Sequence, residues 1–274
     1  MKTIGAARHY DTLDVWYRAL WGDHLHHGIW HPETPDRAEA NANLLRAVAQ
    51  AAGLRPGMRV CDVGCGYGGP ARWLAGHFEV EVTGVTISPV QYEAAKRRTR
   101  DPRVRYLLGD WLGSGLPEGE FDAVVAIESV FHFTEPRAAC REMIRVVKPG
   151  HRIVIAGWII GDLVPAWARW LLIEPIRAAG EMPGLADEWT CRRRFEEEGA
   201  EAVSMTRLGM LVEQSWSDAM GRALRGLLRN PVLRWEALRH PVQTLRLAVS
   251  SLRIWTAYRW GFLDYLILAV ERNR

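Results

Sequence analysis

The sequence predicts an α/β fold: a Rossmann-like, doubly wound sheet of seven strands, with a helical cap built from the N-terminal segment and C-terminal insertions. Short apolar runs alternate with helical patterns between residues 59 and 157, and a glycine-rich turn follows the first of these runs. A last apolar run, 262–271, ends the chain after a long helical region. This alternation is typical of a parallel sheet, which the last run would complete. With 274 residues, 48% of them apolar, the chain can bury a core of that size.

The first half of the chain alternates helix and strand in a regular order. Apolar residues at helical spacing predict a helix over 36–52, which Gly53 closes. We then expect strand 59–63, helix 69–76, strand 80–85, helix 88–100, strand 104–108, strand 121–127, helix 136–147, a turn at 148–150 and strand 151–157. Ser88 would cap its helix, with Pro89 at the first helical position, where a missing N–H costs no hydrogen bond.

The second half is mostly helical. We expect helices over 163–179, 190–198 and 214–258, the last interrupted at 230–231 and 240–241, with strands at 202–208 and 262–271. These elements suggest four parts: a lid segment 1–35, a cofactor-binding core 36–160, core elements with a substrate cap 161–260, and a final strand 261–274.

Composition and charge exclude several classes of protein. The net charge of +3 is too small to indicate a nucleic-acid partner. The four cysteines lie at no recognised metal spacing. The first ten residues lack an apolar core, and the longest apolar run, 153–173, is broken by Asp162, Pro165 and Arg169. We therefore expect a soluble, cytoplasmic protein with reduced thiols.

The glycine turn is the strongest indication of a ligand. Gly64, Gly66 and Gly69 follow a buried strand and open a helix, where a tight backbone and free N–H groups can approach a bound molecule. Asp62 precedes the first glycine by two residues, and its carboxylate would repel the phosphates of a dinucleotide. It suits a ligand with a cationic end, and S-adenosylmethionine is a nucleoside of that kind.

This pattern resembles class I S-adenosylmethionine-dependent methyltransferases over about residues 38–157. Residues 82–91 look like the second-strand motif of tocopherol methyltransferases, sterol methyltransferases and cyclopropane fatty-acid synthases, and 128–132 look like the post-fourth-strand motif of small-molecule C- and O-methyltransferases. Residues 17–30 resemble the lid segment of the tocopherol and sterol groups. One departure is Thr86, which stands where many relatives carry an acid for the ribose.

The resemblance implies a set of cofactor contacts. Asp62, Gly64 and Gly66 would hold the methionine end. The ribose would lie against Thr86, Ser88 and Gln91, the adenine against Asp110 and Trp111, and the sulfonium near Glu128. The cofactor would leave as S-adenosylhomocysteine. Structural roles compete with these, because Ser88 can serve as a helix cap alone and Trp111 as a core residue.

Catalytic candidates follow the fourth strand and lie in the lid segment. Glu128 would meet the cationic centre and His132 is a candidate general base, although both can instead satisfy loop backbone. His27 would line the substrate pocket. The irregular spacing of His24, His26, His27 and His31 does not favour a metal site, and we expect none.

Aromatic and basic residues gather in the two flanks. Of thirteen tryptophans, eleven lie outside 59–157. Candidates for the lid are Tyr10, Tyr17, Trp21 and Trp30, and candidates for the cap are Trp167, Trp170 and Trp255. Between residues 219 and 263 there are eight arginines and a single acid, Glu236. Such basic amphipathic helices either contact an anionic membrane surface peripherally or form a solvated face over a pocket.

The function expected is methylation, at carbon or oxygen, of a lipophilic small molecule such as an isoprenoid, sterol, quinol or polyketide. It would belong to natural-product or lipid biosynthesis. Two alternatives stay open. One is a small-amine N-methyltransferase, and the other is a cofactor-binding protein that does not methylate, either a cyclase or a ligand-binding protein.

Overall fold

The computed structural model describes residues 14–274, which form a seven-stranded sheet in the order β3-β2-β1-β4-β5-β7-β6. The strands are β1 Arg59–Val63, β2 Glu81–Thr86, β3 Val104–Leu108, β4 Phe121–Ile127, β5 Val147–Ile160, β6 Ala200–Arg207 and β7 Leu263–Arg272. The first five pair in parallel, while β7 lies antiparallel between β5 and β6. The predicted α/β fold with a doubly wound sheet is confirmed.

Twelve α-helices within the described residues surround the sheet. They are α2 Asp14–Trp21, α3 Arg37–Ala52, α4 Gly69–Phe78, α5 Pro89–Arg98, α6 Pro136–Val146, α7 Ala166–Ala168, α8 Glu174–Ala179, α9 Glu188–Glu196, α10 Gly209–Val212, α11 Gln214–Arg229, α12 Pro231–Arg239 and α13 Pro241–Arg259. Ser88 caps α5 as expected, since its side chain accepts from the Gln91 N–H. None of the helices in residues 14–274 is both long and apolar enough to cross a bilayer.

Alternation along the strands divides the core into two layers. Val60, Val82 and Val125 belong to the layer beneath α3 and α4, whereas Cys61 and Val124 belong to the layer beneath α6 and α9. Successive strand residues point to opposite faces, so strands buried on both sides are apolar throughout. The sheet is therefore covered on both faces, and a ligand has access only at its strand ends.

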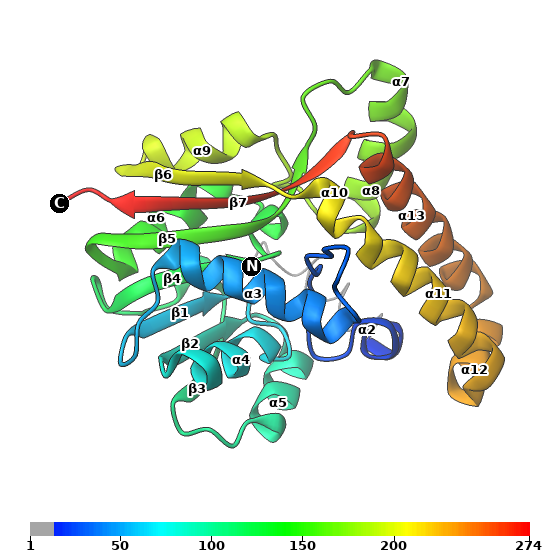
Figure 1. Ribbon diagram of the computed structural model, residues 1–274, viewed down its shortest axis with the longest axis horizontal. Coiled ribbons are helices and arrows are strands. Elements are labelled where there is room, and N and C mark those ends of the chain that lie inside the picture. The colour runs from blue at the N-terminus through cyan, green and yellow to red at the C-terminus, as the bar shows by residue number, and fades with distance from the viewer. Residues whose placement is uncertain (1–13) are drawn as a thin grey trace.

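A helical cap stands beyond the carboxyl ends of the parallel strands. Figure 1 shows α11, α12 and α13 grouped at that end, next to α2. Trp16 and Trp21 of α2 pack with Ala219 of α11 and Leu233 of α12 in a third apolar cluster. The N-terminal segment and the C-terminal helices thus form one cap, as the sequence predicts.

The structure corrects two predicted elements. The predicted turn at 148–150 lies inside β5, which starts at Val147, the register partner of Phe121 on β4, and extends to Ile160 because β7 pairs with it along residues 152–160. The predicted helix over 163–179 is broken into α7, a π-helical turn at Arg169–Ile173 and α8. Pro175 at the start of α8 has no N–H to donate, so regular α-helical bonding cannot continue through it.

Candidate active site

The glycine turn between β1 and α4 needs a backbone without side chains. Gly64, Gly66 and Gly68 all adopt positive φ angles, of 78°, 55° and 73°. A Cβ on Gly64 would collide with Ser129, and a Cβ on Gly68 would collide with the ring of Tyr106. Glycine is the residue that reaches this conformation without steric cost, so the turn is fixed by its sequence.

Asp62 lies below this turn with an unsatisfied carboxylate. Its side chain is buried, and no donor among residues 14–274 reaches its Oδ2 atom. Burial raises the pKa of Asp62 to about 7. A buried carboxylate without a partner is costly, and a ligand ammonium group would relieve that cost. The site therefore fits the methionine end of S-adenosylmethionine.

The three residues predicted to contact the ribose are joined to one another. Thr86 Oγ1 donates to Gln91 Oε1 at 3.0 Å, and the Gln91 N–H donates to Ser88 Oγ at 3.1 Å. All three side chains are buried. The structure thus brings them together at the carboxyl end of β2, and their contact with a ribose stays a prediction.

Asp110 and Trp111 form the turn that follows β3. The Asp110 carboxylate accepts from the Leu112 N–H at 3.1 Å. The Trp111 indole is buried in the core layer of α6, and its Nε1 donates to the carbonyl of Ala139 at 3.1 Å. The geometry therefore gives Trp111 the structural role, and an adenine contact by its ring stays a prediction.

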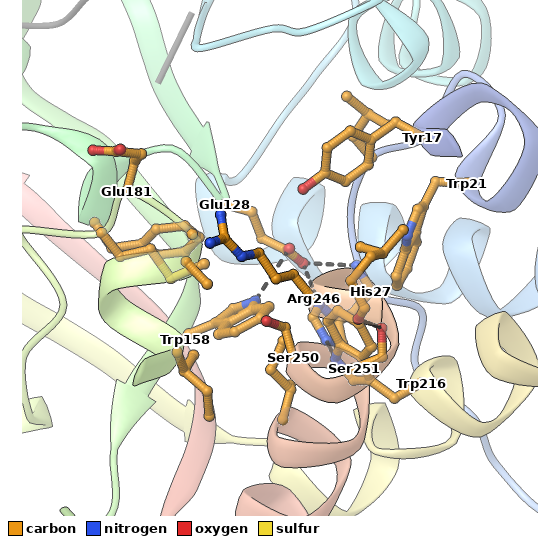
Figure 2. Close-up of a pocket in the computed structure, with 18 of the residues that line it drawn as sticks. Tyr17, Trp21, His27, Glu128, Trp158, Glu181, Trp216, Arg246, Ser250 and Ser251 are labelled. Atoms are coloured by element: carbon orange, nitrogen blue, oxygen red, sulfur yellow. Dashed lines mark hydrogen bonds and ion pairs between the residues drawn. The ribbon is translucent and has the colours of Figure 1, made fainter. Parts of the chain in front are cut away.

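Glu128, the first residue after β4, is the centre of the site. Its carboxylate accepts from the His27 N–H at 2.7 Å and from His27 Nδ1 at 2.8 Å. It also accepts from Trp158 Nε1 on β5 at 3.2 Å and from the Tyr265 hydroxyl on β7 at 3.1 Å. Figure 2 shows this carboxylate facing the cavity lined by the cap. Three parts of the chain thus hold one carboxylate in place.

The backbone of Glu128 is strained. Its φ of 54° is unusual for a residue with a side chain. Burial alone would raise the pKa of the carboxyl, but the His27 ring and its hydrogen bonds outweigh that effect and lower the pKa below its ordinary value. Strained backbone carrying a buried, ionised group is typical of functional sites.

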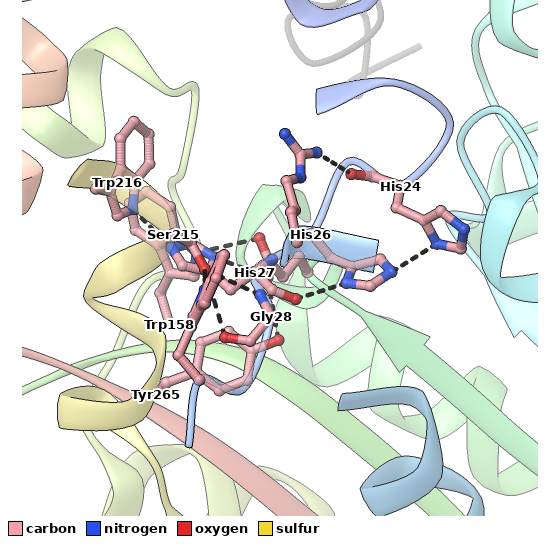
Figure 3. Close-up of polar contacts among 11 residues, drawn as sticks. His24, His26, His27, Gly28, Trp158, Ser215, Trp216 and Tyr265 are labelled. Atoms are coloured by element: carbon pink, nitrogen blue, oxygen red, sulfur yellow. Dashed lines mark hydrogen bonds and ion pairs between the residues drawn. The ribbon is translucent and has the colours of Figure 1, made fainter. Parts of the chain in front are cut away.

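His27 is held as one tautomer. Trp216 Nε1 donates to His27 Nε2 at 2.6 Å, so Nε2 carries a lone pair and the proton lies on Nδ1, where Glu128 accepts it. Figure 3 shows His27 next to Trp216. Its ring centroid lies 5.3–5.8 Å from the rings of Trp21, Trp158, Trp216, Tyr258 and Tyr265. The basic nitrogen of His27 is thus oriented by Glu128 and covered by Trp216.

The neighbouring histidines form a neutral chain. His26 Nδ1 donates to the His27 carbonyl at 2.7 Å, and His24 Nδ1 donates to His26 Nε2 at 3.1 Å. Burial lowers the pKa of His24 to about 3 and of His26 to about 4. Within residues 14–274, no group of His, Cys, Asp or Glu side chains is arranged to hold a metal ion.

A cavity of about 390 Å³ lies against Glu128 and His27. Most of its lining is aromatic or aliphatic: Tyr17, Trp21, Leu25, Phe131, Trp158, Ile176, Met182, Trp216, Leu247 and Ile254. Arg246 and Glu181 also line it, and both are exposed, so they mark edges where the cavity meets solvent. Leu25 links this cavity to the glycine turn, because it lines the cavity and its Cδ1 atom would lie 3.8 Å from a Cβ on Gly66.

Comparison with known proteins agrees with this geometry. The methyltransferase domain family matches residues 61–155. The chain is 31% identical to 27-O-demethylrifamycin SV methyltransferase of Amycolatopsis mediterranei, over 96% of this chain and 95% of that protein. This chain belongs to the S-adenosylmethionine-dependent methyltransferases.

Two further likenesses support the assignment. The methyltransferase is 38% identical to 2-methyl-6-phytyl-1,4-hydroquinone methyltransferase of Synechocystis, over 56% of this chain and 50% of that protein. It thus spans about half the length of that relative. Among solved structures, it superposes on the [4+2]-cyclase SpnF with a TM-score of 0.81, 22% identity, and coverage of 100% of this chain and 97% of the other. That likeness shows the fold alone.

The remaining predicted residues lie at different places in the methyltransferase. Tyr17 and Trp21 line the cavity, as expected of a lid, while Tyr10 lies outside the described residues. Trp30 is buried, and its Nε1 donates to Ser215 Oγ at 3.0 Å, so it anchors the lid segment instead. His132 is buried and its Nδ1 donates to the Glu181 carbonyl at 2.9 Å. Burial lowers its pKa, and the structure does not bring it to the cavity.

The cap tryptophans do not reach the cavity. The side chains of Trp167 and Trp170 are 49% and 73% exposed, and the Trp167 ring packs edge-on against Trp260 and Phe262. Trp255 is half-buried and lines neither this cavity nor its neighbour in the cap. Substrate contact by these three residues stays a prediction that their placement does not support.

Sequence reasoning missed Trp158, Tyr265 and Trp216. Trp158 and Tyr265 are register partners across the antiparallel β5–β7 pair, which brings both side chains to Glu128. In the sequence they appear only as aromatic residues at strand ends, and the register of distant strands leaves no local signal. Trp216 lies in a helical pattern that predicts burial and gives no sign of its His27 contact.

Proposed function

We propose that this methyltransferase acts on a lipophilic small molecule, an isoprenoid, sterol, quinol or polyketide-like acceptor, and transfers the methyl group to carbon or oxygen. The observation that carries the proposal is the aromatic and aliphatic cavity beside Glu128 and His27. Pockets of this kind bind apolar ligands and orient them by a few polar groups. The two relatives are named for a rifamycin derivative and a phytyl hydroquinone, which are lipophilic small molecules of this kind.

The chain's residues divide the work between binding and proton transfer. S-adenosylmethionine, when bound, supplies an electrophilic methyl group on a sulfonium sulfur and leaves as S-adenosylhomocysteine. Asp62 would bind the ammonium group of the cofactor, and the glycine turn would leave room for its methionine end. Most of the rate would come from holding acceptor and methyl group in line in a site that excludes water.

His27 is better placed than His132 to act as the base for an oxygen acceptor, because it lines the cavity. Glu128 holds the Nδ1 proton, so the basic lone pair is on Nε2, where Trp216 donates to it. An acceptor hydroxyl would lose its proton to Nε2 as its oxygen takes up the methyl group. For methylation at an alkene carbon, the Glu128 carboxylate and the surrounding aromatic faces would stabilise the transient cation by about 0.5–2 kcal/mol per ring.

Labelled S-adenosylmethionine tests this proposal. The enzyme is incubated with two acceptor sets, long-chain hydroquinones and small primary amines, and label in each set is measured. We expect transfer to the hydroquinones. Transfer to the amines alone would favour the N-methyltransferase alternative. Tight cofactor binding without transfer to any lipophilic acceptor would favour the non-methylating alternative. The fold is compatible with that alternative too, since it is similar to the fold of the [4+2]-cyclase SpnF.

We further propose that the outer face of α11–α13 rests on an anionic membrane surface. Large apolar side chains are exposed on it, among them Leu228, Trp235 and Leu238. Arginines are interspersed, and no ion pair within residues 14–274 neutralises Arg229 or Arg239. Exposed apolar residues mixed with arginine match the interface of an anionic bilayer.

Vesicle flotation tests the membrane proposal. We expect binding to vesicles that contain phosphatidylserine and little binding to pure phosphatidylcholine. The double change Arg229→Ser and Arg239→Ser should lower the affinity by about tenfold or more, since each basic residue near the surface contributes about 1 kcal/mol. The matched control changes Arg97 and Arg100, on and beside α5, to serine. Equal flotation of both double variants would contradict the assignment.

A further inference from the structure

A second cavity, of about 290 Å³, lies inside the cap between α2, α11 and α13. Its lining is almost wholly apolar and includes Trp16, Leu20, Ala219, Ala223 and Ala248. No charged side chain among the described residues lines it. Two of its hydroxyl groups, on Thr244 and Ser251 of α13, donate to the carbonyls of His240, the N-cap residue, and Leu247, at 3.0 and 2.9 Å. A space of this chemistry accepts an uncharged hydrocarbon group.

This tail chamber, as we call the second cavity, shares a wall with the cavity at Glu128. Tyr17, Trp21, Trp216, Leu247 and Ser251 line both spaces. The Trp21 and Trp216 rings meet edge-on in that wall, with centroids 5.4 Å apart. Moving one of these indoles would therefore join the two spaces.

Trp216 has a second contact that links the wall to the chemistry. Its Nε1 is the donor to His27 Nε2, the nitrogen that would accept the acceptor's proton. The indole is half-buried and comes from α11, so its rotation need not disturb β4, β5 or β7. In Figure 2 it lies on the opposite side of His27 from Glu128.

We propose that Trp216 is a gate: the hydrocarbon tail of the acceptor displaces its indole to enter the tail chamber, and the same movement frees His27 Nε2 for proton transfer. This inference rests on the proposed function, because it assigns the tail of the lipophilic acceptor to a site. Trp216 is a positioning residue here, since it acts on the acceptor's proton through His27. An acceptor without a tail leaves the base covered.

The energies allow such a gate. One net hydrogen bond is worth about a factor of ten in an equilibrium constant. Each methylene that leaves water is worth about a factor of four. Roughly two buried methylenes therefore offset the broken Trp216–His27 hydrogen bond. Each further methylene in the chamber then increases the affinity of the acceptor.

Equilibrium binding of alkyl hydroquinones, in the presence of S-adenosylhomocysteine, tests the tail chamber. In the series from methyl to decyl, wild-type affinity should change little over about the first two methylenes, which offset the broken hydrogen bond, and then rise by about fourfold per methylene until the chamber is full. Ala223→Phe fills the chamber from α11, so the rise should stop at a short chain while methyl hydroquinone binds as before. The matched control, Ala178→Phe on the exposed face of α8, should keep the wild-type series. If Ala223→Phe and Ala178→Phe showed the same chain-length dependence, the proposal would be overturned. A wild-type affinity that did not depend on chain length would also overturn it.

The indole N–H resonance of Trp216 tests the gate in the unmodified protein. It is assigned in a ¹H–¹⁵N spectrum as the signal lost in Trp216→Phe. Decyl hydroquinone should shift it strongly, because the bond to His27 is broken, and methyl hydroquinone should not. A Trp216 signal that is unchanged when the decyl compound is bound would refute the gate.

Failure of the proposed function gives a different pattern. If these compounds bind with the expected chain-length dependence but receive no methyl group, the tail chamber stands and the acceptor assignment is wrong. If methyl groups are transferred to long-chain and short-chain compounds at the same rate and affinity, the methyltransferase function stands and the gate is wrong.

Discussion

Two carboxylates with opposite environments define the chemistry of this methyltransferase. Asp62 is buried without a partner in residues 14–274, whereas Glu128 accepts from His27, Trp158 and Tyr265. The first is prepared for a cation that arrives with the ligand. The second is satisfied by the protein and fixes the tautomer of His27. Their pKa values shift in opposite directions for these reasons, raised for Asp62 and lowered for Glu128.

The raised pKa of Asp62 predicts a pH-dependent cofactor affinity. The ammonium group needs the ionised carboxylate, and the pKa of Asp62 is about 7 in the ligand-free protein. The affinity for S-adenosylmethionine should therefore fall by about tenfold per pH unit below that value, because each unit protonates the carboxylate tenfold further. Calorimetry across pH measures it. Asp62→Asn should bind weakly and lose this dependence, while Asp101→Asn, on the surface, should retain it. An unchanged affinity in Asp62→Asn would refute the assignment.

Replacing Glu128 by glutamine should impair both catalysis and stability. A glutamine places its NH2 group either against the Trp158 donor or against the Tyr265 and His27 donors, because these bind different oxygens of the Glu128 carboxylate. In both orientations His27 loses its charged acceptor. We expect a loss in kcat of about a hundredfold or more, and a decrease in the free energy of unfolding of about 1–3 kcal/mol. Steady-state kinetics and chemical denaturation measure the two effects. Glu201→Gln, on the exposed β6, is the matched control, and full activity in Glu128→Gln would contradict its role.

The lid segment after α2 is locked to the core by close packing. Gly28 donates its N–H to Ser215 Oγ at 3.0 Å, next to the Ile29 N–H that bonds the Ala40 carbonyl of α3. A Cβ on Gly28 would lie 2.5 Å from Ala40 Cβ and 2.7 Å from its carbonyl carbon. The position of His27 thus depends on how closely this segment approaches α3.

Gly28→Ala should therefore separate the lid segment from α3. Overpacking of this kind costs about 1–3 kcal/mol of stability, and the displaced His27 should also lower kcat. Thermal unfolding and kinetics measure the two losses. The matched change Gly76→Ala, within α4, adds a Cβ with open space around it, and it should be neutral or slightly stabilising. If Gly28→Ala were as stable as Gly76→Ala, the packing argument would fail.

At the scale of the whole chain, the sequence predicted what is local and periodic. The strands 59–63, 104–108 and 121–127 match the structure residue for residue, because apolar runs bounded by turns are local signals. The glycine turn and Asp62 pointed to the cofactor for the same reason. Helix 163–179 was right only in outline, since residues 166–179 are helical but include a π-helical turn at Arg169–Ile173, ahead of Pro175, that the sequence pattern did not indicate.

The candidate site was less predictable because it is assembled across the fold. Glu128 and His27 were found from local motifs, but their contact spans a hundred residues. Trp158 and Tyr265 depend on the β5–β7 register, and Trp216 depends on where α11 docks. The cap tryptophans Trp167, Trp170 and Trp255 show the converse, since composition gave them a role in the pocket that their placement does not support. Contacts of this kind follow from tertiary packing alone.

The most direct test of the account is a crystal structure of the complex with S-adenosylhomocysteine and a long-chain hydroquinone. We predict the amino group of the cofactor product against Asp62, the acceptor ring in the cavity beside Glu128 and His27, and its nucleophilic atom facing the sulfur. A cofactor product bound away from Asp62, or an acceptor ring bound outside the Glu128 cavity, would contradict the central claim.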